Sequence, residues 1–209
     1  MNPTRLPQIF IDKYDKLKPK IQQRLNEFSN VSEDKYFYEL CFCICTPQSK
    51  AASAMIVQNE LEKLDFYNKD FDTTPILRRK ENYIRFHNQK SKRLQLIKQQ
   101  WSEIEKILKS DMNDRDKREW LNNNVNGIGR KESAHYLRNI GYKDIAILDR
   151  HILKHLVTCG VFDEIPNIVT KKRYDSVADE FFKFSEKVGI PMDELDLLFW
   201  AEEAGEILK

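Results

Sequence analysis

Apolar residues recur every three or four positions along most of the chain, which is the spacing of one face of an α-helix. The pattern is clearest at Leu94, Ile97, Trp101, Ile104 and Leu108. Strict alternation of apolar and polar positions, which is typical of a half-buried strand, is scarce. The pattern therefore predicts an all-α protein.

The pattern predicts a series of helices along the chain. They cover residues 32–46, 49–64, 91–109, 114–121, 170–189 and 193–208, with shorter helices at 130–139 and from residue 149 onward. An early helix is expected to be interrupted or to begin near Pro19, because proline removes a helical hydrogen bond. Residues 65–90 are expected to be irregular.

The composition is that of a charge-dense globular protein. Hydrophobic residues make up 41% of the 209 residues and charged residues 33%, and 35 basic against 33 acidic side chains give a formal net charge of +2. A net charge this small does not by itself indicate a nucleic-acid partner. No apolar run approaches the ~18 residues that a membrane-spanning helix needs. We therefore expect a cytoplasmic protein without a membrane partner.

The cysteines and histidines do not form a metal-binding pattern. Cys41, Cys43 and Cys45 lie in an apolar segment, which predicts buried free thiols. His151 and His155 are four residues apart, as two metal ligands on one helix can be, but no third ligand accompanies them. No metal site is expected.

Two of the six glycines lie in the stretch 125–129, with the sequence VNGIG. Gly127 and Gly129 predict a tight hairpin between two helices, with Ile128 packed in the core. The free N–H groups and the dipole of the following helix would then suit a DNA phosphate. An ordinary helix–helix turn is the alternative that two glycines alone leave open.

Lys131 and Asp149 are the candidate reactive groups. Lys131 follows Arg130 in the first turn of the predicted helix, where the helix dipole disfavours an ammonium. A neutral lysine amine is a nucleophile that can form a Schiff base with a sugar carbon. Asp149 follows the apolar run 145–148, where it can cap the next helix or move protons. The residues alone leave both interpretations open: a surface lysine with a helix cap, or two catalytic partners.

The stretch VNGIGRK (125–131), followed by AILDRH (146–151), resembles the helix–hairpin–helix DNA glycosylase superfamily. The segment CTPQS (45–49) is similar to the part of that superfamily whose glutamine fills the space left by a flipped base. The segments IRFHNQK (84–90) and DLLFWAEEAGEILK (196–209) resemble the second, mainly archaeal type of 8-oxoguanine DNA glycosylase/lyase. The resemblance spans about residues 35 to 209.

The resemblance implies two helical domains around a DNA-binding cleft. Residues 34–143 would form a barrel-like domain that holds the hairpin, and residues 1–33 with 144–209 would form the second. Lys131 would attack the sugar, and Asp149 would stabilise positive charge on it and help to move protons. The implied reaction excises 8-oxoguanine and cleaves the strand 3′ to the site by β-elimination.

The resemblance also implies a base pocket. Guanine N7 is a hydrogen-bond acceptor, whereas N7 of 8-oxoguanine carries a proton, so the pocket must supply an acceptor. The terminal carboxylate of Lys209 is expected in that role. Trp200 and Phe86 are expected to sandwich the flipped base, and Gln48 to fill the gap that it leaves.

Further DNA contacts are expected from Gly127, Gly129, Arg130 and Arg85. A basic rim is expected from a set of clustered cations: Arg78, Arg79, Lys80, Arg85, Lys90, Lys92, Arg93 and Lys98. No cysteine follows Cys159, so the four-cysteine iron–sulfur cluster of many related enzymes is not expected, nor any other cofactor. The superfamily suggests a monovalent cation at the hairpin carbonyls.

The expected partner is double-stranded DNA containing 8-oxoguanine, bound by a monomer in a prokaryotic cytoplasm. Two alternatives stay open. One is a glycosylase/lyase for oxidised pyrimidines or mismatched bases. The other is a non-catalytic helix–hairpin–helix protein that only binds DNA.

Overall fold

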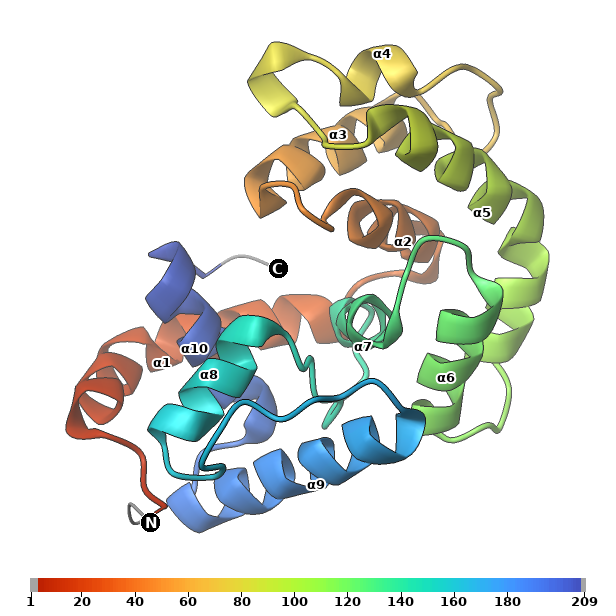
Figure 1. The fold of residues 1–209 in the computed structure, drawn as a ribbon. Coiled ribbons are helices and arrows are strands. Elements are labelled where there is room, and N and C mark those ends of the chain that lie inside the picture. The colour runs from red at the N-terminus through yellow and green to blue at the C-terminus, as the bar shows by residue number, and fades with distance from the viewer. Residues whose placement is uncertain (1–3, 208–209) are drawn as a thin grey trace. The chain divides into compact units, whose positions relative to one another are not determined.

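The computed structural model describes residues 4–207, and this range contains helices but no strand (Figure 1). The prediction of an all-α protein is confirmed. In chain order the elements are α1 (Gln8–Ser29), η1 (Glu33–Lys35), α2 (Tyr36–Cys45), α3 (Ala51–Lys63), α4 (Thr74–Leu77), η2 (Lys80–Asn82), α5 (His87–Leu108), α6 (Asp114–Asn124), α7 (Arg130–Asn139), α8 (Arg150–Thr158), α9 (Lys171–Val188) and α10 (Met192–Ala204).

The helices form two compact units. Unit 1 combines the described residues up to Asn30 with those from Gly141 onward, and unit 2 runs from Val31 to Ile140. The boundaries expected from the sequence, at residues 34 and 144, each lie three residues further along the chain. Unit 1 is therefore built from both ends of the chain, and unit 2 is inserted between them.

Unit 1 is organised around α10, which packs against α1, α8 and α9. Phe199 on α10 lies beside the rings of Phe10 and Phe181, with ring centroids 5.3 and 6.4 Å apart. All three rings are buried in one continuous apolar core. Because eight of its thirteen residues are buried, α10 can serve as the central helix of the unit.

Unit 2 is organised around α2, which packs against α3, α5 and α7. Its last nine residues, from Phe37 to Cys45, are all buried. Cys41, Cys43 and Cys45 are free thiols within this core, which confirms their prediction. Burial raises the pKa of the Cys45 thiol to about 12, so this side chain is an inert, uncharged part of the core.

Three element boundaries differ from the sequence-based expectation. Helix α1 continues through Pro19, because this residue is exposed and solvent can bond the carbonyl group that proline leaves unpaired. Residues 65–90 contain α4, η2 and the start of α5. Helix α10 ends at Ala204, since Gly205 follows in the left-handed conformation with a φ of 79°.

Across residues 4–207, every helix is too short or too polar to cross a bilayer.

Candidate functional site

The glycine turn joins α6 to α7 in unit 2. Val125 and Ile128 are buried on either side of it, as expected for a hairpin that is fixed in the core. Gly127 has a φ of 106°, which strains any side chain, and a Cβ there would lie 2.4 Å from Cδ of Arg93. The turn therefore requires glycine at residue 127 for both conformation and space.

The start of α7 holds a carboxylate. Glu132 accepts a hydrogen bond through Oε2 from the backbone N–H of Gly129, at 3.2 Å. This is the reciprocal part of a capping box, and the negative charge is favourable near the helix N-terminus. A DNA phosphate at the predicted site would share the helix end with this carboxylate.

Arg130 makes a bidentate ion pair with Glu119 on α6. Its Nε lies 2.7 Å from Oε2 and its Nη2 lies 2.6 Å from Oε1. The pair joins the two helices of the hairpin. The expected DNA contact of Arg130 stays a prediction, and so does a monovalent cation at the hairpin carbonyls.

Lys131 makes a weaker ion pair than Arg130 does. Its side chain is 29% exposed, and its Nζ lies 3.9 Å from Oε1 of Glu132. A separation of this size is a weak ion pair, beyond the range of a hydrogen bond. The amine is accessible and can change its position at small energetic cost.

The rest of α7 is fixed by a buried polar network. Glu39 on α2 accepts hydrogen bonds from Gln58 on α3, at 2.7 Å, and from Asn139 on α7, at 3.3 Å. Buried polar groups with satisfied partners specify one packing arrangement. The network therefore fixes the last turn of α7 against α2, whereas the Lys131 side chain in the first turn makes a weak ion pair.

Asp149 caps α8 in unit 1. Its Oδ1 accepts hydrogen bonds from the backbone N–H groups of His151, at 2.8 Å, and Ile152, at 2.9 Å. No donor in residues 4–207 bonds its second oxygen, Oδ2. The cap is confirmed, and it leaves one carboxylate oxygen for other chemistry.

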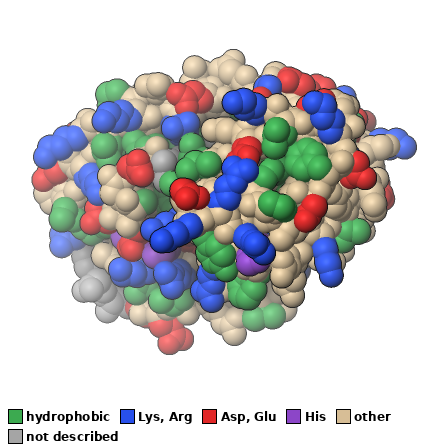
Figure 2. All heavy atoms as spheres, turned by 90° about the horizontal axis from the view of Figure 1, so that it is seen from above, with side chains coloured by type: hydrophobic (Ala, Val, Ile, Leu, Met, Phe, Trp, Pro, Cys, Tyr) green, Lys and Arg blue, Asp and Glu red, His purple; other side chains and the backbone are tan. Residues whose placement is uncertain are grey.

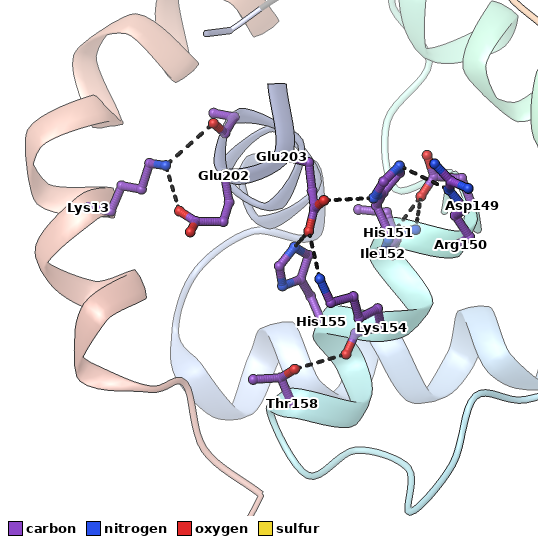
Figure 3. A network of polar contacts seen from close by, with 11 residues as sticks. Lys13, Asp149, Arg150, His151, Ile152, Lys154, His155, Thr158, Glu202 and Glu203 are labelled. Atoms are coloured by element: carbon purple, nitrogen blue, oxygen red, sulfur yellow. Dashed lines mark hydrogen bonds and ion pairs between the residues drawn. The ribbon is translucent and has the colours of Figure 1, made fainter. Parts of the chain in front are cut away.

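The side chains after Asp149 join α8 to α10 (Figure 3). Glu203 on α10 lies 2.9 Å from Nδ1 of His151, 3.0 Å from Nε2 of His155 and 3.3 Å from Nζ of Lys154. Partial burial opposes ionisation, but the Lys154 hydrogen bond and the nearby histidines lower the pKa of Glu203. Burial lowers the pKa of His155. One carboxylate thus holds three side chains of α8.

Trp200 lies on the same helix as Glu203. Its ring is half-buried and meets the His151 ring edge-on, with centroids 6.0 Å apart. Its Nε1 is buried without a hydrogen-bond partner among the described residues. Its role in stacking a base stays a prediction. Lys209, the expected reader of the base, lies outside the described residues.

Three further residues of unit 2 that are expected to contact DNA or the flipped base lie at two exposed turns. Gln48 and Phe86 are both exposed, and both have a φ of 57°, in the left-handed region. Arg85 lies beside Phe86, with its guanidinium carbon 5.4 Å from the ring centroid. Left-handed residues other than glycine are strained and are concentrated at functional sites.

Comparison with known proteins decides the family. The family model for 8-oxoguanine DNA glycosylase matches residues 21–190. The 8-oxoguanine DNA glycosylase/AP lyase of Fusobacterium nucleatum is 40% identical over 94% of both chains. This chain belongs to the 8-oxoguanine DNA glycosylase family.

Two solved structures of the family are also similar to this chain. The 8-oxoguanine glycosylase/lyase of Methanocaldococcus jannaschii, in complex with a 15mer DNA containing 8-oxoguanine, has a TM-score of 0.82 and 33% identity, covering 96% of this chain and all of its own. The 8-oxoguanine DNA glycosylase of Thermotoga maritima has a TM-score of 0.84 and 29% identity, over 97% of both chains. The resemblance inferred from the sequence motifs is confirmed.

One expectation for this 8-oxoguanine DNA glycosylase family member is wrong. Lys90 was expected in an exposed basic rim, but its side chain is buried, with 1% exposure. Arg79, another residue of the expected rim, forms an ion pair with Glu60 at 2.6 Å. On the face in Figure 2, Lys and Arg side chains are interspersed with Asp and Glu. Arg79 and Lys98, two cations of the rim, are therefore paired with carboxylates of the protein itself.

The sequence analysis missed Glu132 and Glu203, and it assigned Lys90 to the wrong surroundings. Glu132 had a readable signal, since glutamate three residues after a helix cap is typical of a capping box. Lys90 and Glu203 had none, because their contacts are made with residues distant in the sequence.

Proposed function

We propose that this protein excises 8-oxoguanine from DNA and then cleaves the strand 3′ to the resulting site. The names of its relatives support this activity, since proteins up to 40% identical are 8-oxoguanine DNA glycosylase/AP lyases. The target base must leave the duplex stack before it can be reached, which costs a few kcal/mol.

The first step is a displacement at the sugar. The neutral amine of Lys131 attacks C1′ while the bond from C1′ to the base breaks, and the base leaves with that electron pair and takes up a proton. Asp149 stabilises the positive charge that develops on the sugar, through the carboxylate oxygen that does not cap α8. Opening of the sugar ring then gives an imine between Lys131 and C1′.

The second step breaks the strand. The imine acidifies the C2′ proton, and its removal expels the 3′ phosphate as the C3′–O bond breaks. Water then hydrolyses the imine and returns Lys131 as the free amine. No cofactor is needed, because the lysine supplies the nucleophile and the carboxylate supplies the charge.

The structural observation that carries the catalytic assignment is the accessible amine of Lys131. It lies in the first turn after the hairpin, and among residues 4–207 its one ion-pair contact is to Glu132, at 3.9 Å. A nucleophile has to reach its target, so a side chain free of strong contacts suits the role. Asp149 caps α8, so its carboxylate is held in a fixed position on that helix.

A panel of duplexes tests the substrate. Each carries 8-oxoguanine, an oxidised pyrimidine or a mismatch at the same position, and single-turnover excision is measured on each. We expect the 8-oxoguanine duplex to react fastest. Faster excision of the oxidised pyrimidine would reject the proposed substrate, and binding of every duplex without cleavage would reject an enzymatic function.

Recognition of the base is assigned to three residues. We propose that Lys209 hydrogen-bonds to the edge of 8-oxoguanine, with Trp200 and Phe86 stacking on the base. Deleting Lys209 should reduce excision of 8-oxoguanine and leave cleavage of a preformed abasic site unchanged. Equal loss of both activities would contradict this assignment.

The proposed setting follows from the substrate. The protein would act as a monomer on double-stranded DNA in a prokaryotic cytoplasm, where the chromosome is accessible. Sedimentation of the protein with and without a short lesion duplex tests the monomer, since a dimer would give twice the expected mass.

A further inference from the structure

Lys90 occupies an unusual position for a lysine. It lies in the opening turn of α5 and is 1% exposed. Its Nζ donates to the backbone oxygens of Cys45, at 2.7 Å, and Pro47, at 2.6 Å, and to Oγ of Ser49, at 3.2 Å. A lysine ammonium has three N–H donors, and here each has one acceptor.

All three acceptors belong to one turn, the segment 45–49 between α2 and α3. The same Ser49 Oγ accepts from the backbone N–H of Arg85, at 3.0 Å. The backbone N–H of Lys90 donates to the oxygen of Phe86, at 2.9 Å. Lys90 therefore connects the 45–49 turn with the 85–86 turn.

Each of these turns carries one strained residue. Gln48 and Phe86 both have a φ of 57°, and both expose their side chains. The left-handed conformation costs ~1–2 kcal/mol for a residue with a side chain. Such residues persist only where the surroundings determine the backbone, and the bonds to Lys90 and Ser49 do so here.

The burial of Lys90 is itself unfavourable. Burial, together with the charges of Arg93 and Arg85, lowers its pKa to about 8, while Cys45 and Glu132 oppose the shift. A buried apolar side chain of similar length would avoid the cost of removing a charge from water. The proposed reaction gives Lys90 no chemical step, so the favourable contribution must come from the turns it holds.

We propose that Lys90 is a positioning residue that holds Gln48 and Phe86 in their left-handed conformations, so that both side chains meet the DNA already in place. The benefit depends on the proposed function, in which these two residues contact the DNA around a flipped base. A turn ordered before binding avoids the ~1–2 kcal/mol per residue that ordering would cost during binding.

The decisive variant is Lys90→Met, which keeps the length and removes the donors. Backbone order parameters of the free protein report the positioning directly. We expect those of Gln48 and Phe86 to fall from about 0.85 to below about 0.6. Asp65 is the internal control, because it is also left-handed, with a φ of 57°, but makes no contact with Lys90. Unchanged values at Gln48 and Phe86 would overturn the proposal.

A kinetic measurement then tests the consequence for DNA. Single-turnover excision is compared on 8-oxoguanine paired with cytosine and on 8-oxoguanine opposite an abasic-site analogue, where no base pair has to be opened. Lys90→Met should slow the paired substrate about tenfold, equivalent to ~1.4 kcal/mol, and the unpaired substrate much less. An equal loss on both would indicate a merely structural role and overturn the proposal.

One further variant and one wild-type control separate the possible failures. Ser49→Ala removes one acceptor of Lys90 and the hydrogen bond with Arg85. It should lower the order parameters of Gln48 and Phe86 by a smaller amount, and it replaces Lys90→Met in the test if that variant does not fold. Inactivity of the wild-type protein on 8-oxoguanine would reject the proposed function, while the order parameters would still decide the role of Lys90.

Discussion

Two lysines of unit 2 lie in the opening turns of two helices, but one side chain is partly exposed and the other is buried. Lys131 is 29% exposed, and within the described part of the chain its amine has one ion-pair contact, at 3.9 Å. Lys90 is 1% exposed and its amine has three acceptors within 3.2 Å. A lysine that attacks a substrate must be accessible, whereas a lysine that holds a turn must have all its donors satisfied.

The comparison also shows that a lowered pKa does not by itself identify a nucleophile. Lys90 has a pKa lowered to about 8, mainly by burial, but the residue is 1% exposed and its amine is bound by two main-chain oxygens and the Ser49 hydroxyl. Geometry therefore takes precedence over protonation in choosing between the two amines.

Removal of the Lys131 amine should have the largest effect. Lys131→Gln keeps a polar side chain of similar size and cannot form an imine, so we expect strand cleavage to fall at least about a thousandfold, or ~4 kcal/mol. Gel assays on an 8-oxoguanine duplex measure the rate. A Lys131→Gln rate within tenfold of the wild type would break the distinction between the two lysines.

Asp149 combines the two behaviours, because one oxygen is fixed and the other is available. Asp149→Asn preserves the cap, since asparagine caps helices as well as aspartate does, but it removes the charge. We expect excision to fall about a hundredfold with an unchanged melting temperature. Asp149→Ala should show the same kinetic loss and also lose ~1 kcal/mol of stability. Wild-type excision by Asp149→Asn would reduce the residue to a helix cap.

In unit 1, Glu203 is expected to hold two helices together, as Lys90 is expected to hold two turns together in unit 2. Glu203→Gln weakens the contacts with His151 and His155, so α8 and α10 should be joined less firmly and excision should fall by a few fold, mainly in kcat. Glu202→Gln is the matched control, because that neighbouring carboxylate pairs instead with Lys13, at 2.6 Å. Equal effects of the two variants would show that the His151–Glu203 contact is irrelevant.

The smallest effect concerns the charge of Lys90. Its pKa is about 8 when folded, below the 10.5 of a free lysine. Between these pH values the unfolded chain binds more protons, so the contribution of Lys90 to the free energy of unfolding rises with pH. Arg85, Arg93 and Glu132 are the charged side chains that act on Lys90.

Urea unfolding of the wild type and Lys90→Met at pH 7.5 and pH 9.5 measures this contribution. The stability of the wild type relative to the variant should increase at the higher pH. A difference that is independent of pH would show that Lys90 is not desolvated as the structure indicates.

Much of the fold follows from the sequence because its determinants are local. Helix α7 begins and ends where the sequence predicts, at Arg130 and Asn139, since the glycine turn precedes it and its apolar positions have a clear period. The start of α5 was placed at Ser91 and lies at His87. The cap residue Phe86 is left-handed without being glycine, and no local signal predicts that conformation.

The site could be predicted only where its residues act alone or in a known motif. Lys131 and Asp149 stand out from the sequence because one follows the glycine turn and the other follows an apolar run. Lys90 was assigned to a charged surface because it lies among other basic residues. Its burial depends on oxygens more than 40 positions away, and such contacts exist only in the folded chain.

Borohydride trapping tests the central claim most directly. The wild type, Lys131→Gln and Lys90→Met are each incubated with an 8-oxoguanine duplex and sodium borohydride, which reduces an imine to a stable covalent adduct. The account predicts adducts with the wild type and with Lys90→Met, and none with Lys131→Gln. An adduct with Lys131→Gln would contradict the assignment of Lys131 as the nucleophile. The absence of an adduct when Lys90→Met is incubated in the same way with a preformed abasic site would also contradict it.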